Sequence, residues 1–267
     1  MDLTLTHVGG PTTLLEVAGW RILTDPTFDA PGRTYRFGWG TSSRKTAGPA
    51  VPAAEIGPID AVLLTHDHHA DNLDDAGRAL LPDVGVVATT ASGATRLTRS
   101  GLGRSVRGLR PWQTTVLQAP GRPTVTVTAT PARHGFRGSR PIVGDVIGFS
   151  LTWEGQQRGA VWVSGDTVLY GGLGEVATRV DVGTAIMHLG RVGFPVTGPL
   201  AYTMGGREAV ELCGLLDPVT VVPVHYEGWS HFRQGRDRII ADLADAPPGI
   251  ADRFRWPAPG VPLRLPV

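Results

Sequence analysis

The sequence is poor in cysteine, since its 267 residues include only one, Cys213. A single thiol cannot form a disulfide within the chain, which excludes a small fold held together by disulfide bridges. Few cysteines are typical of proteins in a reducing compartment, and we therefore expect a cytoplasmic protein. An exported protein with few cysteines has the same composition, and the N-terminus bears on that alternative.

The N-terminus lacks both a basic segment and a long apolar run. Asp2 is followed directly by Leu3-Thr4-Leu5, and the segment has nothing like the roughly 20 apolar residues that cross a bilayer. We therefore expect neither a signal peptide nor a transmembrane helix. Apolar residues still make up 41% of the chain, which is enough for a sizeable core and argues against global disorder.

Acidic residues are also missing from part of the chain. No aspartate or glutamate occurs from Val84 to Gly144, whereas the same stretch holds nine arginines, and the only lysine of the chain is Lys45. The net charge of +1 argues against general binding to polyanions, so we expect no nucleic-acid partner. The acid-free stretch predicts one positively charged region of the surface.

Short runs of leucine, valine, isoleucine and threonine, bounded by glycine and proline, predict that strands dominate the first half. Residues 29–58 are rich in glycine, proline, serine and arginine, which predicts a long loop. Helices are expected at Leu73–Leu81 and Ala91–Ser100. The alternation of threonine and valine from Thr124 to Thr128 predicts a strand with one buried face. The expected strands are Leu3–His7, Thr13–Val17, Trp20–Thr24, Ala61–Leu64, Val84–Ala88, Ser105–Leu109, Thr114–Leu117 and Thr124–Ala129.

The second half mixes strands with helices. Grouped strands followed by mixed strands and helices favour packed sheets flanked by helices, an α+β arrangement. No repeat or linker divides the chain, so we expect residues 1–267 to form a single domain. The expected elements are a hairpin of Val146–Trp153 and Ala160–Ser164, strands at Val182–Met187 and Val219–Val224, helices at Thr203–Leu216 and Gly235–Leu243, and a proline-rich tail.

The densest polar segment is Thr65-His66-Asp67-His68-His69-Ala70-Asp71-Asn72, directly after the apolar run Ala61–Leu64. Three histidines and two aspartates fall within the six positions from His66 to Asp71. Burying a charge without a partner costs on the order of several kcal/mol, so a shared divalent metal is the simplest explanation. The alternative is a polar turn in which Asp71 or Asn72 caps the following helix.

Further metal-competent side chains stand at the ends of other expected strands. Ligands at strand ends have a rigidly fixed orientation, and they can meet at a common edge of the sheet. Neutral imidazoles and carboxylates together suit zinc, manganese or iron, and no thiolate competes with them. Two groups of such ligands permit two ions about 3.5–4 Å apart. The additional residues are His134, Asp166, His188 and His225.

Several motifs occur together and in a characteristic order. They are His7-Val8-Gly9-Gly10, Leu14-Leu15-Glu16, Ile22-Leu23-Thr24-Asp25-Pro26, the segment His66–Asp71, His134, Ser164-Gly165-Asp166 and His225. With them the chain resembles the metallo-β-lactamase-fold hydrolases, in the branch of the L-ascorbate-6-phosphate lactonases and the N-acyl-phosphatidylethanolamine phospholipase D-like enzymes. The resemblance spans nearly the whole chain. It implies a four-layered αββα sandwich with the metals at one edge between the two sheets.

The sequence departs from this family in the main motif, which reads His-x-His-x-Asp-His. Counted from His66, His68 is in register, but Asp71 then stands where the last histidine belongs. Counted back from Asp71, His69 is in register and Asn72 replaces the last histidine. We favour the second register because it keeps the spacing between the second histidine and the aspartate. In either register the second metal site loses one imidazole, so one metal is expected to bind tightly and the other loosely.

The resemblance implies a role for each ligand. A metal-bound water loses a proton more readily, its pKa falling from about 15.7 towards 7, and the metal-bound hydroxide attacks a carbonyl or phosphoryl centre. Asp71 is the expected catalytic residue, orienting the hydroxide and accepting a proton. The expected cofactor is one or two divalent ions, zinc first, with manganese or iron as alternatives. The implied ligands are His66, His69 (or His68) and His134 for the first ion, and Asp71, Asp166 and His225 for the second, with Asp166 bridging.

Other polar residues near these ligands have two interpretations each. Asp25 and Asp67 are candidates to hold the second nitrogen of a ligand histidine. Asp25 is equally explained as a turn carboxylate, and Asp67 is an alternative to His66 as the first ligand. Residues in loops beside metal ligands often contact the substrate and set specificity. The alternative interpretations are a buried histidine with its hydrogen bonds satisfied, a tyrosine that only packs, and an arginine in a solvated basic loop. The candidate substrate contacts are His188, Tyr226, His231 and Arg137.

These residues favour a metal-dependent hydrolase acting on a small or lipid-like ester, lactone, amide or phosphodiester. Arginines near His134 could bind phosphate or carboxylate in bidentate fashion, so an anionic small-molecule substrate is one interpretation and a solvated basic loop is the other. The alternatives are a non-catalytic metal-binding protein and, ranked lower, a nuclease, for which we find no inserted domain or long basic helix. Segments 29–58, 135–145 and 190–202 are expected to shape the pocket, and the sequence favours no particular oligomeric state.

Overall fold

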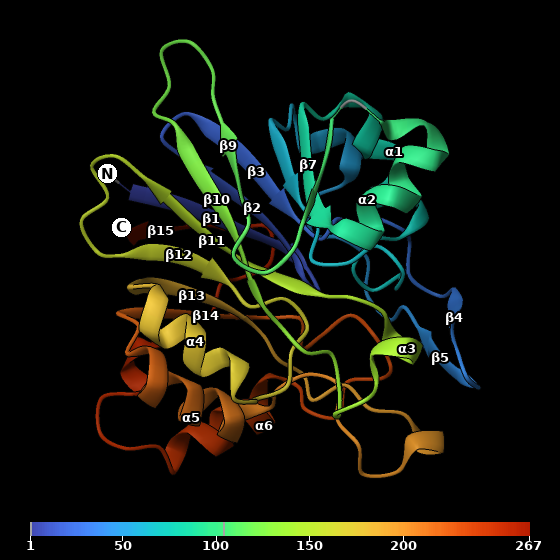
Figure 1. The fold of residues 1–267 in the computed structure, drawn as a ribbon. Helices are drawn as coiled ribbons and strands as arrows, with labels where there is room; N and C mark the ends of the chain where they lie inside the picture. Colours follow the sequence, from blue (N-terminus) through green and yellow to red (C-terminus); the bar gives the residue numbers. More distant parts are fainter. Residues whose placement is uncertain (1, 104) are drawn as a thin grey trace.

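The chain folds around two β-sheets, which a computed structural model describes for residues 2–103 and 105–267. Within these residues the larger sheet contains seven strands, and the last strand of the chain lies beside the first (Figure 1). Its spatial order is β15 (Pro262–Pro266), β1 (Asp2–Gly9), β2 (Thr12–Val17), β3 (Trp20–Thr24), β6 (Ala61–Leu63), β7 (Val86–Thr90) and β8 (Val106–Leu109).

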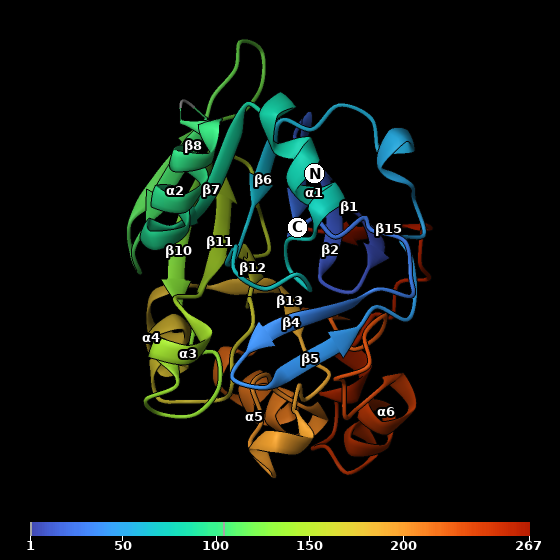
Figure 2. The same cartoon turned by 90° about the vertical axis from the view of Figure 1, so that its right-hand side faces the viewer.

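The second sheet contains six strands in the described part of the chain. A hairpin of β4 (Thr34–Gly38) and β5 (Thr41–Arg44) is separate from both sheets (Figure 2). The spatial order of the second sheet is β14 (Thr220–Val224), β13 (Val182–His188), β12 (Ala160–Val163), β11 (Ile147–Trp153), β10 (Val125–Pro131) and β9 (Thr114–Leu117).

The helices are short and lie on the outside of the sheets. Side chains cap the first two: the Asp74 carboxylate accepts from the Gly77 N–H at the start of α1, and the Thr90 hydroxyl accepts from the Gly93 N–H at the start of α2. Among the described residues, no helix has both the length and the apolar character needed to cross a membrane. The helices are α1 (Asp75–Leu80), α2 (Ala91–Leu97), α3 (Arg140–Val143), α4 (Gly172–Arg179), α5 (Gly206–Leu216) and α6 (Arg236–Ala244), with single turns at Ala53–Glu55, Leu81–Asp83, Thr98–Leu102, Pro195–Thr197 and Ala251–Arg253.

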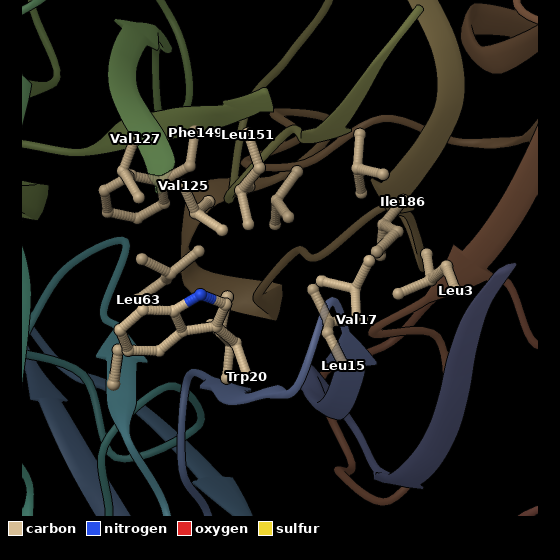
Figure 3. Packing of buried hydrophobic residues seen from close by; sticks show 14 of the residues in the cluster. Leu3, Leu15, Val17, Trp20, Leu63, Val125, Val127, Phe149, Leu151 and Ile186 are labelled. Atoms are coloured by element: carbon tan, nitrogen blue, oxygen red, sulfur yellow. The ribbon is translucent and has the colours of Figure 1, made fainter. Parts of the chain in front are cut away.

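The main hydrophobic core fills the space between the two sheets. Figure 3 shows Leu15, Trp20 and Leu63 of the first sheet facing valine, leucine and phenylalanine side chains of the second. In β10 the valines are fully buried and the threonines between them are partly exposed, which confirms the alternation predicted for Thr124–Thr128.

A further apolar layer covers the outer face of each sheet. Leu64, Leu81 and Leu97 belong to a cluster between the seven-stranded sheet and helices α1 and α2. Trp162 and Leu212 belong to a second cluster, between the six-stranded sheet and helices α4, α5 and α6. The layers therefore follow the order helix, sheet, sheet, helix (Figure 1), which confirms the expected α+β sandwich.

Parallel neighbours bring the polar strand ends together. In the first sheet, β6 pairs in parallel with β3 and β7. In the second, β13 pairs in parallel with β12 and β14. Parallel strands end at the same edge, so the loops after β3 and β6 share one edge of their sheet, and the loops after β12, β13 and β14 share one edge of theirs. These loops carry Asp25, the histidine segment, Asp166 and His225, whereas His134 follows β10 of the second sheet.

Several elements differ from the sequence-based expectation, among them the short helix α3, which was not predicted. Segment 29–58 is not a plain loop, because Tyr35 and Phe37 turn inward and form the strand pair β4–β5. The proline-rich tail contains β15, which tolerates a proline at each end because it is an edge strand that needs fewer backbone donors. Helix α4 was not predicted, since its first turn is rich in glycine, a poor helix former.

Candidate metal centre

The loop after β6 carries the histidine segment and is anchored at its first residue. The backbone N–H and the hydroxyl of Thr65 both donate to the Asp25 carboxylate, over 2.7 and 2.9 Å. Asp25 follows the neighbouring strand β3 and has a φ of +34°, a conformation that is rare outside glycine and recurs at functional sites. The N–H of Ile147 donates to the Thr65 carbonyl over 3.2 Å, which ties the loop to the second sheet.

A first cluster consists of His66, His69 and His134, all of them buried. His69 Nδ1 lies 3.3 Å from His66 Nε2 and 3.2 Å from His134 Nε2. The other nitrogen of each outer ring is already engaged, because His66 Nδ1 is 3.0 Å from the Thr65 hydroxyl and His134 Nδ1 is 2.9 Å from the Tyr202 carbonyl. Those contacts assign the outer protons to Nδ1 and leave two Nε2 lone pairs facing His69.

This arrangement fits a cation better than it fits hydrogen bonds among the rings. One N–H of His69 can satisfy only one of the two facing lone pairs. A tetrahedral zinc ion with Zn–N distances of 2.0–2.1 Å would separate neighbouring nitrogens by about 3.3 Å. The observed separations of 3.2 and 3.3 Å match that spacing. The first cluster therefore has the donor set and the spacing of a metal site.

A second cluster consists of Asp71, His225 and His231. Asp71 Oδ2 lies 3.4 Å from His225 Nε2 and 3.3 Å from His231 Nε2. Within the described residues, both nitrogens of each imidazole and Asp71 Oδ1 lack a hydrogen-bond partner, although all three side chains are buried. Unpartnered buried polar atoms are costly, so five of them together fit a shared partner such as a metal ion.

Asp166 lies between the two clusters. Its Oδ1 is 3.0 Å from His188 Nδ1 and 3.1 Å from His225 Nδ1, while its Oδ2 is 3.9 Å from His134 Nε2. The carboxylate is fully buried, and Oδ2 has no hydrogen-bond partner among the described residues. One oxygen thus faces His188 and His225, with which Asp166 forms a further group of possible metal ligands, and the other oxygen faces the first cluster.

Burial and charge set the protonation of these rings. Burial, together with neighbouring imidazoles, holds the pKa of His69 well below its usual value, so the ring is neutral and has a lone pair for a cation. Burial likewise lowers the pKa of His231 to about 4. Burial also opposes the charge of His225, but Asp166 and Asp71 outweigh it and raise the pKa of His225 to about 10. A metal ion between the same carboxylates would displace that proton.

His68 lies outside both clusters. Its Nε2–H donates to the Val143 carbonyl, and its ring packs against Gly144, where a Cβ would come within 2.5 Å of the imidazole. The structure therefore brings together the ligand atoms of the second register, His66 and His69, and turns His68 toward the segment after β10.

The two remaining polar side chains of the segment also point elsewhere. The Asp67 carboxylate accepts from Arg96 of α2, with 2.8 Å between Oδ2 and Nε. Asn72 Nδ2 donates to Asp25 Oδ2 over 3.3 Å. Of the two candidates for holding a ligand histidine, Asp25 reaches His66 through the Thr65 hydroxyl, whereas Asp67 is paired with an arginine.

Replacing His69 with alanine should cost more bound metal than replacing His68. Removal of a ligand nitrogen should lower metal affinity at least 100-fold, whereas His68→Ala changes a neighbouring contact and should stay within about tenfold. Metal content after dialysis against a weak chelator, measured by mass spectrometry, compares the two variants directly. Equal losses, or a larger loss in His68→Ala, would support the other register.

The four candidate substrate contacts lie in different surroundings. His188 is fully buried and its Nδ1 contacts Asp166, the carboxylate that lies between the two clusters. His231 belongs to the second cluster. Tyr226 packs in the core below α5 and α6, with its ring centroid 5.5 Å from that of Trp256. Arg137 is exposed and does not line either of the two cavities that reach His134.

The first cluster opens into a cavity of about 380 Å³. Of the cluster residues, His69, Asp71 and His134 reach it. The walls come from 29–58, 135–145 and 190–202, which confirms the segments predicted to shape the pocket. A second cavity of about 410 Å³ reaches His134 from another side and carries three arginines. The first cavity is lined mainly by apolar side chains, namely Phe37, Trp39, Phe136, Ile142, Val143, Val192, Phe194, Val196, Leu200 and Tyr202.

The sequence reasoning did not identify the aromatic wall of this cavity. Phe37 lies 5.2 Å from His69 and 6.0 Å from Phe194, measured between ring centroids. The available signal was the alternation of Tyr35 and Phe37 with polar residues, which the surrounding glycine and arginine obscured. His231 was singled out only as a substrate contact, and its place beside Asp71 depends on tertiary contacts.

Comparison with known sequences places the chain among related proteins. A sequence profile described as a beta-lactamase superfamily domain matches residues 20–226. A protein of Pyrobaculum calidifontis named UPF0173 metal-dependent hydrolase is 27% identical over 233 residues, covering 85% of each chain. A protein of the same name from Caldivirga maquilingensis is 24% identical over 265 residues, which is 98% of each chain.

Solved structures resemble the chain over nearly its whole length. An isothiocyanate hydrolase from Delia radicum gut bacteria superposes with a TM-score of 0.79 at 22% identity, covering 97% of this chain and 98% of that one. A metallo hydrolase from Ignicoccus hospitalis gives a TM-score of 0.73 at 21% identity, covering 99% of each chain. At these identities the similarity concerns the fold alone.

Proposed function

The chain belongs to the metallo-β-lactamase superfamily as a metal-dependent hydrolase, and we propose that it hydrolyses a small, uncharged, largely apolar compound. The observation that carries this proposal is that two groups of buried metal-competent side chains lie beneath an apolar cavity, and that the second group has ring nitrogens and a carboxylate oxygen without hydrogen-bond partners among the described residues. The proposed reaction cleaves an ester, lactone or amide bond, or hydrolyses a compound with a similarly electrophilic carbon.

The proposed ligands divide between two sites. A divalent ion lowers the pKa of a coordinated water from about 15.7 towards 7 and so supplies a nucleophile at neutral pH. Zinc suits these imidazoles and carboxylates best, with manganese or iron as alternatives. His66, His69 and His134 would hold one ion, and Asp71 and His225 would hold the other, with Asp166 shared between them.

Asp71 is the proposed proton acceptor. Burial opposes its charge, but His225 and His231 outweigh burial and lower the pKa of Asp71 to about 2, so it is a carboxylate at neutral pH. It lines the cavity, and its Oδ1 has no hydrogen-bond partner among the described residues. In the hydrolysis, the water oxygen bonds to the acyl carbon and the bond to the leaving oxygen or nitrogen breaks. Asp71 takes the proton from water and passes it to the leaving group.

The cavity supports a neutral substrate in place of the anionic one expected from the sequence. Its lining contains no lysine or arginine, and burying an unpaired anion there would be costly. Arg110, Arg133 and Arg140 line the second cavity instead, where His134 is the only cluster residue. An isothiocyanate, the substrate class named for one structural neighbour, is neutral and has an electrophilic carbon, so it belongs in a substrate screen.

A matched substrate panel tests the proposed class. Zinc-loaded protein should cleave neutral aryl and alkyl esters, lactones or isothiocyanates at least tenfold faster in kcat/KM than carboxylated or phosphorylated analogues of the same size. Faster turnover of the anionic analogues would contradict the neutral class. Bound metal without turnover of any substrate would favour the non-catalytic alternative.

A cavity variant and a matched surface variant locate the substrate. Leu200→Arg places a charge at the cavity wall and should lower kcat/KM for a neutral substrate about tenfold, roughly the 1.4 kcal/mol of losing part of an apolar contact. Leu215→Arg changes an exposed leucine of α5 that does not line the cavity and should leave kcat/KM unchanged. Equal effects of the two substitutions would place the substrate elsewhere.

A further inference from the structure

The loop after β6 offers the second cluster one ligand where the family motif offers two. Asn72 stands at the position of the last motif histidine, and its Nδ2 lies 3.3 Å from Asp25 Oδ2. Its Nδ2 is therefore engaged with the loop anchor, and an amide supplies no imidazole nitrogen to the second cluster. Two protein ligands and a shared carboxylate make three, one fewer than the four that hold zinc in structural sites.

His231 fills this gap from a different part of the chain. Its Nε2 lies 3.3 Å from Asp71 Oδ2, the oxygen that is also 3.4 Å from His225 Nε2. Ligand atoms of the three residues lie within 4.8 Å of one another. His231 is 4% exposed, and neither of its ring nitrogens has a hydrogen-bond partner in the described part of the chain. A buried imidazole with both nitrogens free is a candidate metal ligand.

Backbone hydrogen bonds hold the loop that carries His231 on both sides, so the orientation of the ring is fixed. The His231 carbonyl accepts from the Gly193 N–H over 3.2 Å, and the N–H of Ser230 donates to the Arg44 carbonyl over 2.9 Å. The ring stacks on Trp229 with 6.0 Å between centroids and an interplanar angle of 14°. Packing and backbone bonds of this kind pre-organise a ligand before the metal binds.

We propose that His231 is a protein ligand of the second metal site and replaces the imidazole that Asn72 does not supply. The proposal rests on the proposed function, because it takes metal ions to occupy both clusters. Contact with the substrate explains His231 less well, since Asp71 lines the cavity and His231 does not. Two imidazoles and a carboxylate, with Asp166 alongside, suit zinc, iron or manganese. The chain would then bind two ions firmly, not one firmly and one loosely.

Zinc stoichiometry of the full-length protein tests this assignment. Parent and His231→Phe, which keeps an aromatic ring without a ligand atom, are dialysed in a zinc buffer and the zinc per chain is measured. The parent should hold two ions and the variant one, with the affinity of the second site at least 100-fold lower. Cobalt titration gives an independent signal, because the absorbance change of the second equivalent should be missing in the variant. His231→Cys, which can bind zinc through a thiolate, should recover part of the second equivalent.

A matched control is His7→Phe, which changes another fully buried histidine that bonds to the Gly10 carbonyl and belongs to neither cluster. It should keep both ions. A parent that binds no divalent metal overturns the proposed function as a whole. If the parent binds one or two ions and His231→Phe binds the same number with the same affinities, the role of His231 alone is overturned. If His231→Phe does not fold, His231→Gln is measured in the same way.

Discussion

Asp166→Ala should yield a folded protein that retains little or no divalent metal and has no measurable hydrolase activity. The Asp166 carboxylate faces both clusters, at 3.1 Å from His225 Nδ1 and 3.9 Å from His134 Nε2. Its loss removes a ligand shared by two ions and leaves buried imidazoles without a counter-charge. We expect metal affinity to fall at least 100-fold and kcat/KM at least 1,000-fold, about 4 kcal/mol of transition-state stabilisation.

Metal analysis and activity should be measured on the same Asp166→Ala sample, with circular dichroism to confirm folding. Asp181→Ala is a suitable control, because Asp181 is an exposed aspartate just before the next strand, β13. This control should keep both metal and activity. Full metal occupancy in Asp166→Ala would contradict the bridging role, and full activity without metal would contradict the proposed function.

The approximate location of the site was predictable because apolar runs indicate buried strands, and the candidate ligands directly follow these runs in the sequence. His134, Asp166, His188 and His225 all stand at or just after strands of one sheet. The pairing of these strands gathers their ends, and the sequence already places the polar residues there. Parallel neighbours such as β12, β13 and β14 make this convergence a consequence of topology.

The register within the histidine segment was harder to predict, because it depends on a turn and not on spacing. The N–H groups of Asn72 and Leu73 both donate to the His69 carbonyl, over 3.2 and 3.0 Å. This tight turn directs His69 inward, while Arg96 draws Asp67 outward. Neither contact has a signature in the local sequence, so two registers remained open until the structure was available.

His231 illustrates a contribution that a single sequence hides. It lies six residues after His225 in the loop between β14 and α6, and its orientation depends on backbone hydrogen bonds to Arg44 and Gly193, both distant in sequence. The apolar cavity has the same origin, because its walls come from β4–β5 and from 190–202. Long-range contacts of this kind are set by the packed fold and carry no local periodicity.

Asp71→Asn should separate metal binding from proton transfer. The substitution keeps the shape of the side chain and an oxygen that can contact an ion, but an amide cannot accept the proton that a carboxylate accepts. Asp71 lines the cavity and its Oδ1 is free of hydrogen bonds among the described residues, so the carboxylate is placed for that role. We expect kcat to fall at least 1,000-fold while the ion held by His66, His69 and His134 stays bound.

Steady-state kinetics and zinc content of the Asp71→Asn protein decide between the two roles. Asp145→Asn is the matched control, since Asp145 lines the second cavity and pairs with Arg140, and it should keep kcat within about twofold. Loss of both ions in Asp71→Asn would indicate that the main role of Asp71 is metal binding and not proton transfer. A kcat within tenfold of the parent with zinc content unchanged would transfer the proton-accepting role to another group. Asp166 would then be the next carboxylate to test, since its Oδ2 is likewise unpartnered in the described chain.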